Sequence, residues 1–164
     1  MPSGIVHAQC SLILAAPAFG LAYGLTNNHL VSGVACAFGC VFGIMLTPDL
    51  DQETISSSEY SLVKWTMGLG FLWMMLWFPY ARLCKHRSPL SHWPFLGTLG
   101  RLLYISLFGG IALALGWKPP VFPLSILYWA LAGLVISDIA HWILDTRFGD
   151  IGRSRKPRRR TAHR

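Results

Sequence analysis

The side chains in this sequence that could do chemistry are mostly histidine and aspartate, and they stand in four short groups. The candidate metal ligands are an early histidine, two aspartates of a Pro-Asp-Leu-Asp turn, two histidines of a His-Arg-Ser-Pro-Leu-Ser-His element and a late Asp/His/Asp set: His7, Asp49, Asp51, His86, His92, Asp138, His141 and Asp145. Imidazole nitrogens combined with carboxylate oxygens, without thiolates, suit Zn²⁺, Mn²⁺ or Fe²⁺. Eight ligands exceed what one ion needs, so the sequence predicts a site for one divalent ion or for two.

The late set is the most informative group. Asp138, His141 and Asp145 are spaced three and four residues apart within an apolar run. In a helix of about 3.6 residues per turn, this spacing puts them within about 60° of one face. Each ionisable group costs about 2.5–3.5 kcal/mol at the bilayer centre on insertion scales, so the three need partners that a divalent cation and water would supply. The aspartate turn and the loop histidines also have ordinary structural alternatives, a helix end and a basic juxtamembrane loop.

The rest of the chain is too apolar for an ordinary soluble domain. Of its 164 residues, 53% are hydrophobic and 13% are charged, with a mean hydropathy of +0.46. Soluble domains usually carry about 25% charged residues. This composition excludes a disordered chain, a coiled coil and a disulfide-rich secreted domain, and it predicts a small polytopic membrane protein.

Five apolar segments are expected to position the ligands. They cover residues 6–25, 30–46, 62–80, 95–116 and 121–144. At a rise of about 1.5 Å per residue, helices of about 17–25 residues can cross a hydrocarbon core of about 30 Å. No segment alternates apolar and polar residues in the manner of a strand, so we predict an all-α chain.

The third segment differs from the others in composition. It contains Trp73, Trp77 and Tyr80, and these residue types prefer the interface between membrane and water. Two glycines, Gly68 and Gly70, could interrupt a helix there. The segment therefore either spans the bilayer, lies in the interface or enters and returns.

A single shared site sets a condition on this segment. If all five segments span, His7, Asp49 and Asp51 lie at one face of the bilayer and the other ligands lie about 30 Å away. A shared site then needs an even number of crossings between Asp51 and His86. We predict an integral membrane helical bundle of four spanning helices, with an interfacial or re-entrant helix at 61–80. The five-span bundle is the alternative, which the 19-residue apolar run favours.

The net charge of +7 is concentrated at the C-terminal end, where seven of the last twelve residues are basic. We therefore predict a transmembrane metal-binding domain at 1–148 and a basic disordered cytoplasmic tail at 149–164. By the positive-inside rule, this tail together with Arg82, Lys85 and Arg87 places the site and the C-terminus in the cytoplasm. The expected location is the cell (inner) membrane, crossed several times.

Membrane lipids are the expected partners. The basic tail is either a solvated end that fixes orientation or a contact for anionic lipid headgroups. Nucleic acid is not an expected partner, because no aromatic residue interleaves with the charges of the tail.

The order of the motifs resembles that of a known family. In sequence order they are His7, Pro48-Asp-Leu-Asp51, His86-Arg-Ser-x-x-Ser-His92 and Asp138-x-x-His141-x-x-x-Asp145. This order resembles a family of small bacterial membrane proteins that bind metal, a family similar to the YdjM-like membrane-bound metal-dependent hydrolases. The resemblance covers about residues 1–148. Two features depart from the YdjM-like pattern: Ser88 stands where glycine is usual, and 34 residues separate Asp51 from His86.

The resemblance implies metal binding and, through the hydrolases, ester cleavage. We predict a metal-dependent hydrolase that acts on a phosphoester or another ester near the bilayer. Asp51, His86 and Asp145 would help the metal to activate water, and Arg87 would bind an anionic oxygen of the substrate. The alternative is a non-enzymatic membrane protein that binds metal or serves as a scaffold.

Overall fold

The computed structural model describes residues 4–51, 60, 63–64, 66, 68, 70–84 and 88–148. Its regular elements are α1 (Gly4–Leu25), α2 (Leu30–Phe42), the 3₁₀ turn η1 (Pro48–Asp51), α4 (Gly70–Leu83), α5 (Pro89–His92), α6 (Pro94–Ala114), α7 (Leu124–Ile143) and the π-helical turn η2 (Leu144–Phe148). No strand occurs in the part of the chain that is described, which confirms the all-α prediction.

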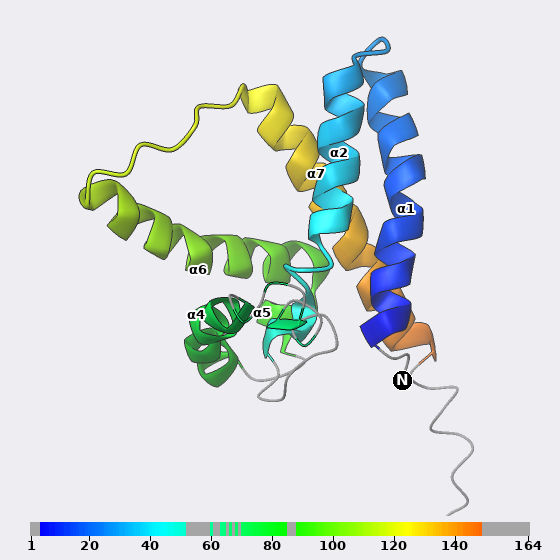
Figure 1. Cartoon of the computed structure of the whole chain (residues 1–164). Coiled ribbons are helices and arrows are strands. Elements are labelled where there is room, and N and C mark those ends of the chain that lie inside the picture. Colours follow the sequence, from blue (N-terminus) through cyan, green and yellow to red (C-terminus); the bar gives the residue numbers. More distant parts are fainter. Residues whose placement is uncertain are drawn as a thin grey trace, which may run out of the picture.

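Helices α1, α2 and α7 pack side by side as a three-helix bundle (Figure 1). A tight turn joins α1 to α2, and its residues Asn27 and Asn28 have positive φ angles of 52° and 66°. Asparagine tolerates this left-handed conformation better than most residues, so the polar turn can be very short. The short turn makes α1 and α2 antiparallel neighbours, and α7 lies against both.

Small residues bring the backbones of α2 and α7 together. A Cβ atom at Gly39 would overlap the carbonyl oxygen of Ala130, and one at Gly133 would overlap that of Cys36. Helices that pack within lipid commonly use small residues in this way. The close contact fixes the register of the two helices, so the turn that follows α2 lies beside the end of α7.

In the part of the chain that the structure describes, three helices are long and apolar enough to cross a membrane: α1, α6 and the continuous stretch Leu124–Thr146 that contains α7. Helix α2 has 13 residues and rises about 20 Å, less than the hydrocarbon thickness of about 30 Å. The predicted helix at 30–46 is therefore too long. After Phe42 the backbone changes to hydrogen bonds that reach three residues back, as from the Ile44 amide to Val41 O (3.0 Å). Pro48, which cannot continue a helix, follows shortly afterwards. The described residues thus contain three candidate spans and one shorter apolar helix, α2.

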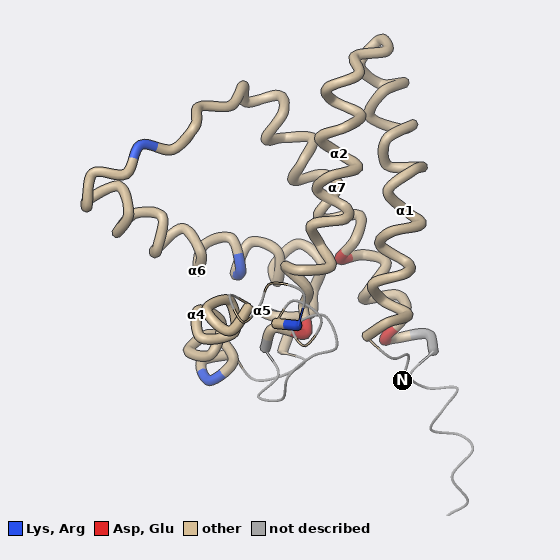
Figure 2. Tube along the Cα trace, in the orientation of Figure 1, with Lys and Arg blue, Asp and Glu red and all other residues tan. Residues whose placement is uncertain are grey.

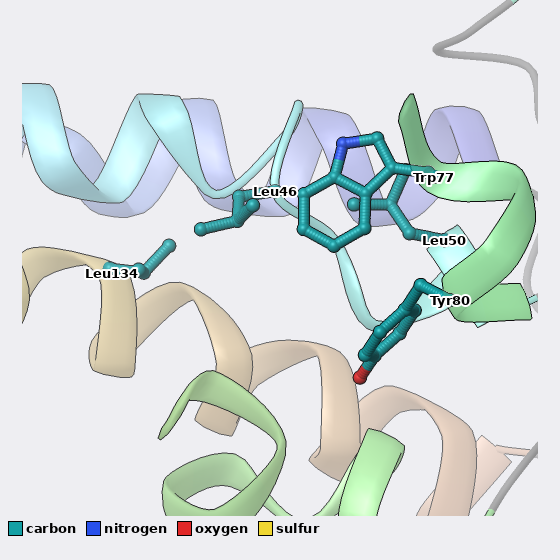
Figure 3. Packing of buried hydrophobic residues seen from close by; sticks show 5 residues of the cluster. All are labelled: Leu46, Leu50, Trp77, Tyr80 and Leu134. Carbon is teal, nitrogen blue, oxygen red and sulfur yellow. The ribbon is translucent and has the colours of Figure 1, made fainter. Parts of the chain in front are cut away.

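Helix α4 represents the described part of the predicted interfacial segment at 61–80. With 14 residues it is too short to cross a bilayer of about 30 Å. It packs at the η1 end of the molecule, where Trp77 and Tyr80 cover Leu46 and Leu50 (Figure 3). Its position in the interface remains a prediction, but its aromatic face holds the chain close to η1.

Helix α6 leaves the bundle and contacts it mainly near its own N-terminal end (Figure 1). Its second half and the first turns of α7 carry exposed large apolar side chains, among them Leu107, Ile111 and Leu124. The acidic residues instead gather toward the end of the bundle where α1 begins and α7 ends (Figure 2). That end contains the candidate site.

Candidate metal centre

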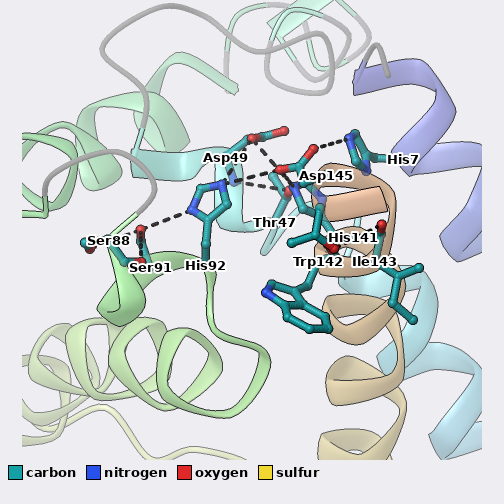
Figure 4. A network of polar contacts seen from close by, with 11 residues as sticks. His7, Thr47, Asp49, Ser88, Ser91, His92, His141, Trp142, Ile143 and Asp145 are labelled. Carbon is teal, nitrogen blue, oxygen red and sulfur yellow. Dashed lines mark hydrogen bonds and ion pairs between the residues drawn. The ribbon is translucent and has the colours of Figure 1, made fainter. Parts of the chain in front are cut away.

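Five of the predicted ligands come together where α1, η1, α5 and α7 meet (Figure 4). We call this group the His–Asp cluster, and its members are His7 of α1, Asp49 of η1, His92 of α5, His141 of α7 and Asp145 of η2. Prolines at the first positions of η1 and α5 help to set these short elements, because a fixed φ angle suits the first turn. Residues far apart in the sequence thereby share one end of the bundle.

Asp145 lies at the centre of the cluster. Its Oδ1 is 3.2 Å from His7 Nε2, and its Oδ2 is 3.5 Å from His141 Nε2 and 3.7 Å from His92 Nε2. Its position in a π-helical turn is one that the sequence did not predict, and such turns often occur at functional sites.

Asp49 faces two of the same histidines. Its Oδ1 is 3.7 Å from His141 Nε2 and 4.0 Å from His92 Nε2. The turn that follows α2 and the end of α7 therefore reach one site, as a shared membrane face requires.

These separations have the size expected for ligands around an ion. Among the five distances only that from His7 to Asp145 falls within the usual range of hydrogen bonds, about 2.7–3.2 Å. Two ligands held tetrahedrally at about 2.0–2.2 Å from one ion lie about 3.3–3.6 Å apart. The separation of 3.5 Å lies in this range, those of 3.2 Å and 3.7 Å lie close to it, and that of 4.0 Å exceeds it, so the side chains surround a position that a cation can occupy after a small adjustment.

The burial of the histidines and the charge of the cluster also favour a bound cation. His7, His92 and His141 are 8%, 9% and 5% exposed, and His141 Nε2 has no hydrogen-bond partner among the residues described. The rings of His7 and His141 stack with centroids 3.9 Å apart, an arrangement that two charged imidazolium rings would oppose. Neutral imidazole is the form that binds metal. One divalent cation held by neutral imidazoles would balance the two carboxylates.

A small cavity with a mixed polar and apolar lining opens beside the cluster. His7, Asp49 and His141 line it together with the hydroxyl-bearing residues Ser11 and Ser137. Its volume of about 20 Å³ has room for about one water molecule. The Ser11 hydroxyl donates to the carbonyl oxygen of His7 at 3.2 Å, and its oxygen lies 2.8 Å from that of Ser137, so the two hydroxyls keep lone pairs that can accept hydrogen bonds.

The sequence places Asp138 among the ligands, and the structure places it elsewhere. Its Oδ2 accepts hydrogen bonds from Arg101 Nη2 and Thr98 Oγ1 of α6, and Arg101 and Asp138 are almost fully buried. The helical spacing correctly predicted that the Asp138 carboxylate needs a cation. It did not predict that this cation is the guanidinium group of Arg101 in α6. The missed signal was Arg101 itself, a charged residue within an apolar segment, which carries its own cost of burial.

Three predicted catalytic residues are not placed. His86 and Arg87 lie outside the described residues, and Asp51 ends η1 with its side chain outside the described part. Their predicted roles therefore remain predictions.

The fold and the site together define an all-helical protein with a candidate metal centre and helices apolar enough for a membrane. The chain belongs to the family described as "Uncharacterized metal-binding protein (DUF2227)", whose model matches residues 2–121. The matched stretch contains His7, Asp49 and His92, whereas His141 and Asp145 follow it. No curated protein and no solved structure matches the chain. The family supports the predicted metal binding, while kinship with bacterial YdjM-like hydrolases remains a prediction.

Proposed function

We propose that the protein is a membrane-embedded, metal-dependent hydrolase that cleaves a phosphoester or another ester at the membrane surface. Its metal is a divalent ion, Zn²⁺, Mn²⁺ or Fe²⁺, bound by the His–Asp cluster. The observation that carries this proposal is the meeting of three imidazole nitrogens and two carboxylates in two overlapping triplets, within each of which the ligand atoms lie within 4.8 Å of one another. Sites of mixed histidine and carboxylate ligands are typical of catalytic rather than structural metal centres.

The described residues favour one ion over two. The cluster contains two overlapping triplets of ligand atoms, and both require His141. The Nε2 atom of a histidine has one lone pair and binds one ion, so the triplets cannot be two complete and separate sites. A second ion would draw its ligands from Asp51 and His86.

The surrounding residues support hydrolysis. When bound, the ion would polarise the scissile group and make water a better nucleophile. The cavity beside His7 and His141 would hold that water, with Ser11 and Ser137 orienting it through their hydroxyl groups. A carboxylate would accept its proton, with Asp145 and Asp51 as our candidates, and Arg87 would bind an anionic oxygen of the substrate.

The membrane location rests on the three long apolar helices, with the cluster at one end of the bundle. We propose that this end faces the cytoplasm at the inner membrane, since the basic residues of 149–164 and Arg82 favour that side. The tail at 149–164 would contact anionic lipid headgroups. Four spans, with 61–80 in the interface, remain our preferred topology.

A non-enzymatic metal-binding or scaffold protein is the second candidate. The observation that favours it is the enclosure of the cluster: five described ligands nearly fill the shell of one ion, and the adjoining cavity holds about one water molecule. Such a centre would bind metal with little room for a substrate.

Metal analysis of the detergent-purified protein, followed by a panel of phosphoesters and other esters with and without chelator, separates these candidates. Hydrolysis that chelation abolishes and added metal restores would support the hydrolase. Bound metal without hydrolysis of any ester in the panel would favour the second candidate. A folded protein that binds no divalent metal would overturn both. His29→Ala is the matched control, because His29 bonds to Ser32 at 2.9 Å, outside the cluster.

A further inference from the structure

Ser91 and His92 are adjacent in α5 and are joined by a hydrogen bond (Figure 4). The Ser91 side chain is fully buried, with 0% exposure. Its Oγ lies 3.1 Å from the carbonyl oxygen of Ser88 and 3.1 Å from His92 Nδ1. A carbonyl oxygen can only accept, so the single hydroxyl proton of Ser91 is donated to Ser88. With its proton engaged there, the Ser91 oxygen is placed to accept a hydrogen bond from a protonated Nδ1 of His92.

This direction of bonding determines which nitrogen of His92 is available. With the proton on Nδ1, the Nε2 atom of neutral histidine carries a lone pair. That atom lies 3.7 Å from Asp145 Oδ2 and 4.0 Å from Asp49 Oδ1. A lone pair that faces two carboxylate oxygens repels them in the absence of a cation and completes a ligand set in its presence.

We propose that Ser91 is a positioning residue of the metal centre. It fixes His92 in the Nδ1-protonated tautomer and directs Nε2 toward the ion. The proposal rests on the metal centre proposed above and adds a residue that touches neither metal nor substrate. Outer hydrogen bonds of this kind usually fix the tautomer and the orientation of a histidine that binds metal.

The backbone around Ser91 is built to hold it in place. The amides of Ser91 and His92 both donate to the carbonyl oxygen of Ser88 at 3.0 Å, so this oxygen anchors the short helix. A Cβ atom at Gly97 would overlap the carbonyl oxygen of Ser91, so α5 lies directly against α6. A serine that only stabilised a turn would make the bond to Ser88. The second bond, to His92 Nδ1, indicates the positioning role.

The same geometry provides a matched control within the motif. The hydroxyl oxygens of Ser88 and Ser91 are 3.3 Å apart, beyond the usual range of about 2.5–3.0 Å for a hydroxyl donor. Ser88 therefore acts through its carbonyl, which Ser88→Ala retains. Ser91→Ala removes the acceptor of the His92 proton.

The test is titration of purified full-length protein in detergent with Zn²⁺ or Mn²⁺ against a competing chelator. We expect Ser91→Ala to weaken metal binding about 10–100-fold, the usual effect of losing an outer hydrogen bond. We expect Ser88→Ala to bind like the wild type and Ser91→Cys, whose sulfur is a weak acceptor, to lie between. Ser106→Ala on the exposed face of α6 controls for the loss of a helical serine.

The outcomes separate this proposal from the one on which it rests. A wild-type protein without metal affinity would end the metal centre itself. A wild type that binds metal and a folded Ser91→Ala variant that binds it equally well would overturn the role of Ser91 alone, as would equal losses in Ser91→Ala and Ser88→Ala. Should Ser91→Ala fail to fold, ¹⁵N NMR of the imidazole of His92 in the metal-free wild type decides. At a pH where the ring is neutral, a proton on Nδ1 supports the proposal, and a proton on Nε2 overturns it.

Discussion

The stretch from α7 into η2 holds a buried aspartate and a half-buried one in different surroundings. Asp138 bonds directly to Arg101 and Thr98 of α6, so the protein itself supplies the cation. Asp145 instead faces three histidine nitrogens at 3.2–3.7 Å, separations that leave space for an ion. A carboxylate buried in an apolar helix needs a positive partner, because unpaired charge is costly there. The two sites show that a carboxylate's type and spacing do not reveal which partner satisfies it.

The largest effect on stability should follow from breaking the buried ion pair of Arg101 with Asp138. Arg101→Met leaves Asp138 buried without its cation, so we expect the free energy of unfolding to fall by about 3–5 kcal/mol. Unfolding by denaturant in detergent measures this change. The double variant Arg101→Met/Asp138→Leu should recover most of the loss, because apolar replacement of a buried pair is often nearly neutral. An unchanged stability in the single variant would mean that the pair is not the counter-ion arrangement described.

Removing His141, the ligand that both triplets share, should affect the His–Asp cluster and not the pair of Arg101 with Asp138. At a free metal concentration 100 times Kd, binding to the native state should raise the free energy of unfolding of the wild type by about 2.7 kcal/mol. His141→Ala should lose this increment, measured against the metal-free stability of the same variant, because both ligand triplets contain His141. Thermal unfolding with and without metal provides the measurement. His29→Ala should keep the increment, and an equal loss there would contradict the assignment.

Loosening the contact between α2 and α7 should disturb the His–Asp cluster, which depends on both helices, more than the Arg101–Asp138 pair, which joins α6 to α7. Gly133→Ala forces α7 away from α2, whose following turn carries Asp49, and overpacking of this kind costs about 1–3 kcal/mol. We expect weaker metal binding, because Asp49 and His141 move apart, while the pair between α6 and α7 persists. Chelator competition and unfolding measure the two effects. Gly20→Ala, where a Cβ meets nothing within 4 Å, is the control and should leave metal binding unchanged.

The smallest expected difference lies within the cluster. Asp145 lies near three histidines and Asp49 near two, so Asp145→Asn should weaken metal binding more than Asp49→Asn. Both changes preserve shape and remove one negative charge. Titration of the two variants side by side gives the ratio of their dissociation constants. A larger loss in Asp49→Asn would move the centre of the site from η2 to η1.

The sequence predicted the long helices well. The expected segments at 6–25, 95–116 and 121–144 correspond to α1, α6 and α7 within a few residues. Hydropathy and proline positions determine such boundaries locally, so one sequence is enough. Helix α2 is shorter than expected because the chain tightens before Pro48, a detail of turn geometry that hydropathy does not express.

The site was predictable in its ligand types and only partly in its membership. Histidines and aspartates are conspicuous in an apolar chain, and the need for a shared membrane face is enough to link Asp49 with His141. The partner of Asp138 depends on how α6 packs, which is a tertiary property. The π-helical turn at Asp145 and the bond from His92 to Ser91 likewise depend on backbone geometry that residue spacing alone does not determine.

The cluster joins residues from near both ends of the described chain, because His7 lies in the first turns of α1 and Asp145 follows α7. During synthesis the N-terminal helices emerge first. The cluster therefore lacks His141 and Asp145 until α7 and η2 have been made, although His7, Asp49 and His92 are already present. Metal loading would then occur only on chains extended through Asp145. A product truncated before α7 would retain three of the five ligands and lack the carboxylate that contacts all three histidines. Bound metal would thus raise the free energy of unfolding of full-length chains and not that of chains truncated before α7.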